Sequence, residues 1–496
     1  MSESNAMVQK LWNFATVLRD DGISYGDYVE QLTYLVFLKM DYERTLPPLE
    51  LKSDIPKEWN WESLLNLDGV ELEIHYRTLL EGLSKSHGLI GLIFRKSQNK
   101  IQNPALLKRL VNLIHDGGKQ SWLSMSVDVK GDIYEGLLEK NAQDTKSGAG
   151  QYFTPRVIID AMVEVMKPTP KDTIYDPACG TGGFLLSAHS YIKANYKLNK
   201  EDEKRLKEEA LRGCELVSNT ARLCVMNMYL HNIGGNESPI EVNDSLLGTP
   251  SVHYSMILSN PPFGSKSAIK IINEDGKEDK DSVTYQRDDF WATTSNKQLN
   301  FVQHINSLLE INGRAAVVVP DNVLFENGAG ETIRKKLLQN CDLHTILRLP
   351  TGLFYAQGVK ANVIFFDRKG ASEQVQTKDV WIYDLRTNQH FTLKRDPMTK
   401  ADLEDFIKCY NADNRHQRVE TEKFKKFTYD EIIKRDNTNL DIFWLKDESV
   451  EDSANLPEPK VLIEDILENL EYVKSEFEEI YEELGEVISK DKRMIL

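Results

Sequence analysis

The sequence has few cysteines and no apolar run long enough to span a membrane. Its 496 residues include five cysteines, and no two of them form a CxxC pair. This pattern indicates reduced thiols and argues against a disulfide framework or a zinc site. The opening stretch, MSESNAMVQK, does not have the shape of a signal peptide. We therefore expect a cytoplasmic protein that binds no metal and does not contact a membrane.

The chain also lacks an excess of positive charge. Its formal net charge is −16. Residues 461–486 contain ten acidic residues and one lysine, a net charge of −9, which leaves −7 for the rest of the chain. Such a chain does not have the basic surface that binds a nucleic acid unaided. If DNA is the substrate, another chain would have to supply many of the contacts to it. The sequence has no GxxxxGK[ST] motif, which argues against a phosphate loop for ATP.

The length and the changing sequence pattern predict several domains. Residues 1–145 carry apolar side chains at helical spacings and predict a helical domain. Residues 146–395 alternate short apolar strands with helices, which predicts an α/β domain with a doubly wound, mostly parallel sheet. Residues 396–459 form a variable polar region and a linker.

Two further segments depart from this alternation. Residues 460–496 place apolar side chains at alternating steps of four and three from Ile466 to Val487, a heptad seam that requires a partner helix. An amphipathic helix folded back on its own domain is the alternative. A polar insertion at residues 264–290 shows no clear period, and a loop of this length inside a domain is usually functional or mobile.

A glycine-rich turn marks the start of the α/β domain, in the stretch TIYDPACGTGGFLLSAH. A strand ends at Asp176, the turn contains Gly180, Gly182 and Gly183, and a helix follows. Glycines let the backbone approach a ligand, and the helix N-terminus offers unpaired N–H groups. The carboxylate before the turn would repel a pyrophosphate but would hold an ammonium group. A plain connection between strand and helix is the alternative.

Acidic residues also end the next two predicted strands. Glu215 ends the second strand, where an acidic residue of a nucleoside-binding fold accepts hydrogen bonds from ribose hydroxyls. Asp244 follows the third strand and could accept from the amino group of an adenine. A turn-forming role is the alternative for Asp244.

The fourth strand ends in the sequence Asn-Pro-Pro-Phe, at Asn260, Pro261, Pro262 and Phe263. Proline cannot donate to a strand ladder, so the strand must stop in a stiff elbow. The Asn260 side-chain oxygen and the Pro261 carbonyl could both accept from one –NH2 group and make it more nucleophilic. Phe263 offers a flat face for a base that has left its duplex. The four strand ends together indicate methyl transfer to an amine from an adenosine that carries a positive tail.

The sequence resembles amino-group methyltransferases that use S-adenosylmethionine and, within them, the modification subunits of type I restriction-modification systems. The resemblance lies in QYFTPRVI, DPACGTGGF, NPPFG, GRAAVVVPDNVLF and LPTGLFYAQGVKANVIFF, in this order. It implies a Rossmann-like methyltransferase domain behind a helical accessory domain. It also implies methylation of adenine N6 in double-stranded DNA by base flipping.

The resemblance also implies a set of site residues and partners. Asn260, Pro261, Pro262 and Phe263 would receive the flipped adenine. The cofactor-binding residues would be Gln151, Tyr152, Phe153, Thr154, Asp176, Ala178, Gly180, Thr181, Gly182, Gly183, Glu215, Asp244 and Ser245. A separate specificity subunit would read the target sequence. It would bind this chain through the C-terminal helix and the N-terminal domain. A second copy of this chain and a restriction subunit would be further partners.

The residues themselves leave other functions open. The same elbow could present a cytosine N4, a base in RNA or a protein glutamine amide, because each is a planar amine. A methyltransferase-like scaffold without activity would require a broken pocket, whereas the acidic strand ends and the elbow are intact. A dehydrogenase fits least well, given the acid before the glycines. Cys179, inside the turn, is interpreted as a small residue, since no histidine is placed by the sequence to activate it.

Overall fold

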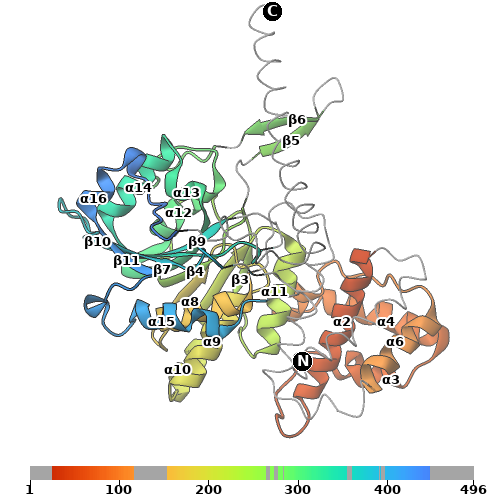
Figure 1. The fold of residues 1–496 in the computed structure, drawn as a ribbon. Coiled ribbons are helices and arrows are strands. Elements are labelled where there is room, and N and C mark those ends of the chain that lie inside the picture. The colour runs from red at the N-terminus through yellow and green to blue at the C-terminus, as the bar shows by residue number, and fades with distance from the viewer. Residues whose placement is uncertain are drawn as a thin grey trace, which may run out of the picture. The chain divides into compact units, whose positions relative to one another are not determined.

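The computed structural model describes residues 25–116, 154–263, 268–272, 278–282, 284–354, 360–389, 391 and 397–446. The chain divides into two compact units (Figure 1). The first unit comprises Met1–Gln151 and Lys167–Ser259, and the second comprises Tyr152–Met166 and Asn260–Leu496. The domain limits expected at residues 145, 395 and 459 stay predictions.

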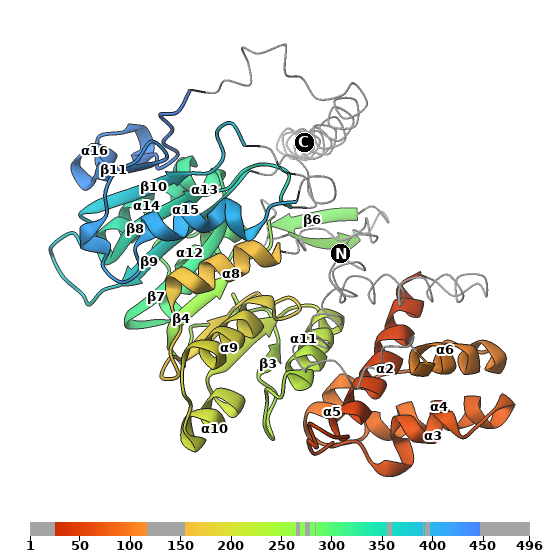
Figure 2. The same cartoon turned by 60° about the horizontal axis from the view of Figure 1, so that its bottom comes forward.

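The N-terminal part of the first unit is helical, as its sequence pattern predicts (red and orange in Figure 2). Helix α4 shows why: Leu72, Tyr76, Leu79 and Leu83 follow one another at steps of four, three and four, and all four are fully buried. The elements are α2 (Tyr25–Arg44), η1 (Lys57–Trp59), α3 (Trp61–Leu65), α4 (Gly69–Ser84), α5 (Gly88–Ile93) and α6 (Pro104–Asp116).

The first unit also contains four strands in the order β4-β1-β2-β3, all parallel. Because parallel strands end at the same edge of a sheet, the residues at and after their C-terminal ends gather along one line. The strands are β1 (Ile174–Asp176), β2 (Leu211–Glu215), β3 (Ile240–Val242) and β4 (Tyr254–Ser259), and the helices that accompany them are α9 (Gly183–Asn195), α10 (Lys200–Glu208) and α11 (Ser218–Leu230).

Helix α11 joins these strands to the N-terminal helices. The Arg44 guanidinium donates to the carbonyl oxygen of Tyr229 at 2.8 Å, and the rings of Phe37 and Tyr229 lie 5.5 Å apart. Arg222 forms an ion pair with Glu30 at 2.6 Å. The helical part and the glycine-rich turn thus belong to one packed unit.

The second unit supplies five strands to the main sheet, in the order β11-β10-β8-β9-β7. Strand β9 is antiparallel to both of its neighbours, β7 and β8. Strands β8 and β10 are parallel to each other, and β11, at the end of the order, is antiparallel to β10. The strands are β7 (Leu309–Pro320), β8 (Cys341–Arg348), β9 (Ala361–Arg368), β10 (Asp379–Asp384) and β11 (Phe424–Thr428).

Helices cover both faces of the strands in the second unit, with α12 and α14 on one side and α8 and α15 on the other (Figures 1 and 2). The helices are α8 (Arg156–Met166), α12 (Lys297–Leu308), α13 (Asn322–Phe325), α14 (Ala329–Asn340), α15 (Lys400–Tyr410), η3 (Arg415–Gln417), α16 (Tyr429–Ile433) and η4 (Asp436–Thr438). The expected α/β class, with a doubly wound and mostly parallel sheet, is therefore confirmed.

The short apolar strands expected within residues 146–395 correspond to β1 to β4 and β7 to β10. The polar insertion contains a hairpin that no pattern predicted, formed by β5 (Ala268–Ile272) and β6 (Glu278–Ser282). The region after residue 395 is more structured than its polar composition indicates, because it supplies α15, β11 and α16 to the second unit. Each of these two helices begins with a capping box.

The predicted heptad helix at residues 460–496 lies outside the described residues. Within the described ranges, every helix is too short or too polar to serve as a transmembrane span.

Candidate active site

Asp176 anchors the glycine-rich turn. Its side chain is 1% exposed, and Oδ1 accepts hydrogen bonds from Ser259 Oγ at 2.6 Å and from the Ala178 backbone N–H at 3.0 Å. Burial raises the pKa of Asp176 to about 7, although both hydrogen bonds lower it. Among the described residues no basic side chain forms an ion pair with this carboxyl. Asp176 is therefore a buried acid whose ionised form a bound cation would stabilise.

The turn itself requires glycine at two positions. Gly180 has φ +55° and Gly182 has φ +91°, which side chains with a Cβ rarely adopt. A Cβ at Gly182 would also meet Cys224 Sγ at 2.9 Å, whereas a Cβ at Gly180 would meet nothing within 4 Å. Cys179 Sγ lies 3.9 Å from Cys224 Sγ, and its thiol pKa is raised by that contact and by burial. The turn is thus packed directly against α11, and Cys179 stays protonated, as expected for a structural cysteine.

These contacts give a testable difference between two glycines. We expect Gly182→Ala to lower the free energy of unfolding by about 2–3 kcal/mol, because it adds a clash with Cys224 to an unfavourable φ. Gly180→Ala meets only the unfavourable φ and should cost about 1 kcal/mol. Denaturant unfolding measures both. Adding Cys224→Ala to Gly182→Ala should recover part of the loss, and no recovery would contradict the clash.

Glu215 and Asp244 lie at neighbouring strand ends. Glu215 is 9% exposed and accepts hydrogen bonds from the backbone N–H of Gly180 at 3.1 Å and of Val217 at 2.9 Å. Burial raises its pKa. Asp244 Oδ1 accepts from the Leu246 N–H at 3.0 Å, which is the turn-forming role that the sequence left open. Direct hydrogen bonds therefore join Asp176 to Ala178 and Glu215 to Gly180.

Two exposed leucines at this edge were missed by the sequence reasoning. Leu216 directly follows Glu215 and is 64% exposed, and Leu247 follows the Asp244 turn and is 62% exposed. Each leucine follows an acidic strand end, so a ligand bound beside these acids would contact exposed apolar surface. The sequence signal for these residues is a leucine one to three positions after each acid. A search for polar groups alone does not find it.

The elbow after β4 contains an unpartnered acceptor. Asn260 Nδ2 donates to Thr154 Oγ1 at 2.8 Å, and Asn260 Oδ1 is buried without a hydrogen-bond partner within the described part of the chain. Thr154 therefore accepts from the elbow, two residues before α8 begins. A buried acceptor without a partner is costly, about 1–3 kcal/mol, so this oxygen favours a donor that the described residues do not supply.

Phe263 ends the elbow and packs against Phe354. The two ring centroids lie 5.5 Å apart with an interplanar angle of 72°, and Phe263 is 7% exposed. The elbow thus has one aromatic wall that is fixed by a second ring.

The remaining predicted site residues are partly described. Thr181 lies in the glycine-rich turn, where its carbonyl accepts from Asn227 Nδ2 at 3.3 Å. Ser245 is half-buried in the turn after β3. Gln151, Tyr152 and Phe153 lie outside the described residues. Over the ranges that the structure describes, no group of three or more His, Cys, Asp or Glu side chains could hold a metal ion.

Two family models match the chain. The N-6 DNA Methylase model matches residues 125–452, and the HsdM N-terminal domain model matches residues 7–114. The chain is 38% identical over 530 aligned residues to the type I restriction enzyme EcoKI methylase subunit of Escherichia coli K12, covering 97% of this chain and 96% of that protein. It is 33% identical to the EcoEI methylase subunit of Escherichia coli, over 86% of this chain and 88% of that protein.

Solved structures of type I methylase subunits are also similar to this chain. The crystal structure of the EcoKI M protein matches with a TM-score of 0.53 and 33% identity, over 97% of this chain and 96% of that chain. A modification subunit of a type I restriction enzyme from Vibrio vulnificus matches with a TM-score of 0.70 and 26% identity, over 87% and 94%. The chain therefore belongs to the methylase subunits of type I restriction enzymes, which are DNA methyltransferases specific for adenine N6.

Proposed function

We propose that this chain transfers a methyl group from S-adenosylmethionine to N6 of an adenine flipped out of double-stranded DNA. Asn260, Pro261, Pro262 and Phe263 would form the acceptor site. The observation that carries the proposal is the buried and unpartnered Asn260 Oδ1. An oxygen of this kind favours a ligand that brings its own N–H donor, and the N6 amino group of adenine is such a donor.

The strand ends of the first unit fit the cofactor. Asp176 is a buried carboxyl with a pKa of about 7, and the ammonium of the cofactor's amino-acid tail would stabilise its ionised form. Glu215 would accept from the ribose hydroxyls, and the exposed Leu216 and Leu247 would contact the adenine ring. Asp244 and Ser245 would complete this end, with Gln151 to Thr154 next to the tail. When bound, the cofactor supplies a methyl carbon on a positively charged sulfur.

The elbow would prepare the amine. The Asn260 amide is oriented by its hydrogen bond to Thr154, which leaves the oxygen to accept from N6 together with the Pro261 carbonyl. Both acceptors would hold the N6 hydrogens and leave the nitrogen lone pair free to bond to the methyl carbon. The bond to sulfur would break towards sulfur, and one N6 proton would leave to water. Phe263 would stack on the flipped base. No covalent enzyme intermediate is needed, in agreement with the raised pKa of Cys179.

Ser259 and Asn260 are neighbours in the chain, and each would serve one part of this chemistry. Ser259 Oγ holds the carboxyl of Asp176 at 2.6 Å, and Asn260 is the next residue in the chain. The residue that holds Asp176 therefore directly precedes the acceptor elbow in the chain.

We also propose that recognition of the target sequence belongs to a separate specificity subunit. The formal charge of −16 argues that this chain does not hold DNA by itself. The N-terminal domain and the predicted helix at residues 460–496 would contact that subunit. A second copy of this chain and a restriction subunit would complete the assembly, in line with the relatives named as subunits of type I restriction enzymes.

One experiment tests the substrate and the partner together. The full-length chain is incubated with methyl-labelled S-adenosylmethionine and duplexes that offer a methylatable adenine or only cytosine, with and without its specificity subunit. We expect label on N6-methyladenine alone, and only when the subunit is present. Label on cytosine N4, on RNA or on glutamine-containing peptides would overturn the proposed substrate.

A further inference from the structure

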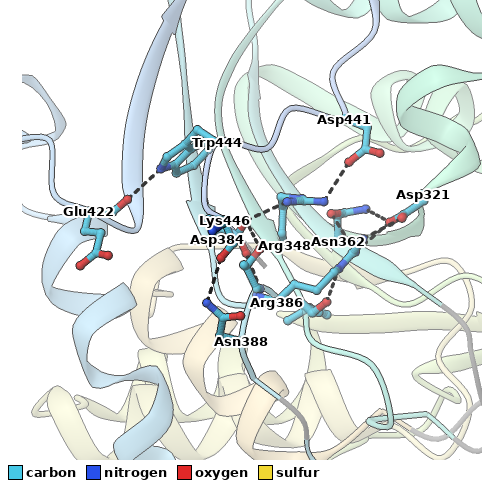
Figure 3. Close-up of polar contacts among 12 residues, drawn as sticks. Asp321, Arg348, Asn362, Asp384, Arg386, Asn388, Glu422, Asp441, Trp444 and Lys446 are labelled. Carbon is cyan, nitrogen blue, oxygen red and sulfur yellow. Dashed lines mark hydrogen bonds and ion pairs between the residues drawn. The ribbon is translucent and has the colours of Figure 1, made fainter. Parts of the chain in front are cut away.

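A cluster of buried polar side chains lies at one edge of the second unit and has no part in the chemistry above (Figure 3). Asp321 directly follows β7, Arg348 ends β8, and Asp384 ends β10. Asn362 is the second residue of β9, which runs the other way and so begins at the same edge. Arg386, two residues after β10, reaches into this cluster.

Arg386 and Asp321 form a two-pronged ion pair. The two terminal nitrogens of Arg386 donate to the two carboxylate oxygens of Asp321 at 2.7 and 2.8 Å, and the side chains are 12% and 15% exposed. Burial alone would raise the pKa of Asp321, but the hydrogen bonds and charge of Arg386 hold it below its usual range. Asn362 Nδ2 donates to the same carboxylate at 2.7 Å. The guanidinium is thus locked in one orientation.

The other donors of Arg386 hold two backbone carbonyls. Nε donates to the carbonyl oxygen of Leu349 at 2.8 Å, and a terminal nitrogen donates to that of Ala361 at 2.9 Å. The Leu349 N–H in turn donates to the Ala361 carbonyl at 3.0 Å. Arg386 therefore fixes the point at which the chain leaves β8 and the point at which it enters β9.

The segment that leaves β8 leads to the aromatic wall of the acceptor elbow. Five residues after Leu349, Phe354 is 2% exposed and packs edge-on against Phe263 at 5.5 Å. The connection from Leu349 to Phe354 contains Pro350, whose ring fixes φ, and Gly352, which has φ +82°. Hydrogen bonds join Asp321 to Arg386 and Arg386 to Leu349, and the chain from Leu349 leads to Phe354, whose ring packs against Phe263.

We propose that Arg386 and Asp321 are a positioning pair for methyl transfer, which holds the Phe354 segment so that Phe263 can receive the flipped adenine. This inference rests on the proposed function of the Asn260 elbow. The pair does not touch the substrate and acts through Leu349 and Phe354. Arginine is required because lysine has no planar fork that could serve a carboxylate and two carbonyls at once.

The test uses Arg386→Met in the full-length chain together with its specificity subunit. We expect kcat/KM for the DNA duplex to fall about 100-fold, since a displacement of about 1 Å at a reacting centre has an effect of that size. The fluorescence increase of a 2-aminopurine placed at the target adenine should be lost, because the flipped base is no longer held. The Kd for S-adenosylmethionine should stay within about twofold, since the strand-end residues proposed for the cofactor, Asp176, Glu215 and Asp244, belong to the first unit. Arg386→Lys should restore part of the activity.

Arg418→Met is the matched control. Arg418 is also buried, and it donates to the carbonyl oxygens of Tyr410 at 2.7 Å and His344 at 3.2 Å, not to the Phe354 segment. We expect a loss of thermal stability similar to that of Arg386→Met, with methyl transfer and fluorescence retained. If both variants lost transfer equally, the effect would be general destabilisation and the proposal would be overturned.

Two further variants keep the test decisive. If Arg386→Met does not fold, Asp321→Asn, which keeps the shape of the side chain, is measured with the same readouts and should show the same loss of transfer. Unchanged transfer and fluorescence in Asp321→Asn and Arg386→Lys would overturn the inference. Asn260→Ala separates the two claims: activity in that variant refutes the proposed elbow, whereas an inactive Asn260→Ala beside an active Arg386→Met refutes the positioning pair alone.

Discussion

Asn260→Ala is expected to reduce methyl transfer about 1000-fold while cofactor binding survives. The variant removes the one buried side-chain oxygen of the elbow that has no partner within the described residues. Loss of a single oriented hydrogen-bonding group at a reacting centre typically costs about 100- to 1000-fold in rate. Single-turnover transfer with labelled S-adenosylmethionine measures the rate, and calorimetry measures the Kd of the cofactor.

Thr154→Val provides the matched comparison for this prediction. The Thr154 hydroxyl accepts from Asn260 Nδ2 and so orients the amide without offering the oxygen to the substrate. We expect a smaller loss, about tenfold, because the amide remains but can rotate. Transfer at the wild-type rate in Asn260→Ala would show that the acceptor role is assigned to the wrong residue.

The second large effect concerns Asp176 and pH. The pKa of about 7 means that this carboxyl is mostly protonated at pH 6 and mostly ionised at pH 8. Only the ionised form attracts the cofactor's ammonium, so the affinity for S-adenosylmethionine should rise about tenfold from pH 6 to pH 8. Asp176→Asn should weaken binding about 10- to 100-fold and remove this pH dependence.

Protein stability should change with pH in the opposite direction. The folded pKa of Asp176 lies above its ordinary value of 3.8, so the folded state favours the protonated carboxyl. The stability that Asp176 contributes to the folded state is fully present below about pH 4 and is lost as the pH rises through about 7. In the absence of cofactor, Asp176→Asn should remove this pH dependence of the free energy of unfolding. Glu203→Gln, an exposed carboxyl on α10, serves as the control and should change neither profile. A slope that survives in Asp176→Asn would contradict the account.

Much of the fold could be predicted from the sequence because its signals are local. The buried strands β1, β2 and β4 are short apolar runs, and Asp176, Glu215 and Asn260 stand at or directly after their ends. The helices between them show apolar residues at helical spacing. Such patterns depend only on which face of an element is buried.

The parts that were not predicted depend on partners far away in the chain. The hairpin of β5 and β6 is polar, and β11 is recognisable as a strand only through its pairing with β10. The role of Arg386 follows from Asp321, which lies 65 residues away, and no local pattern joins the two. The exposed Leu216 resembles any surface leucine until its place beside Glu215 is known.

The central claim concerns two oxygens that hold one amine. The most direct test is a structure of the full-length chain with its specificity subunit, a target duplex and S-adenosylhomocysteine. We predict an adenine outside the duplex, with N6 about 3 Å from both Asn260 Oδ1 and the Pro261 carbonyl oxygen, and with the base stacked on Phe263. An elbow turned away from the extruded base, or Asn260 Oδ1 bonded to another group of the chain in that complex, would contradict the account.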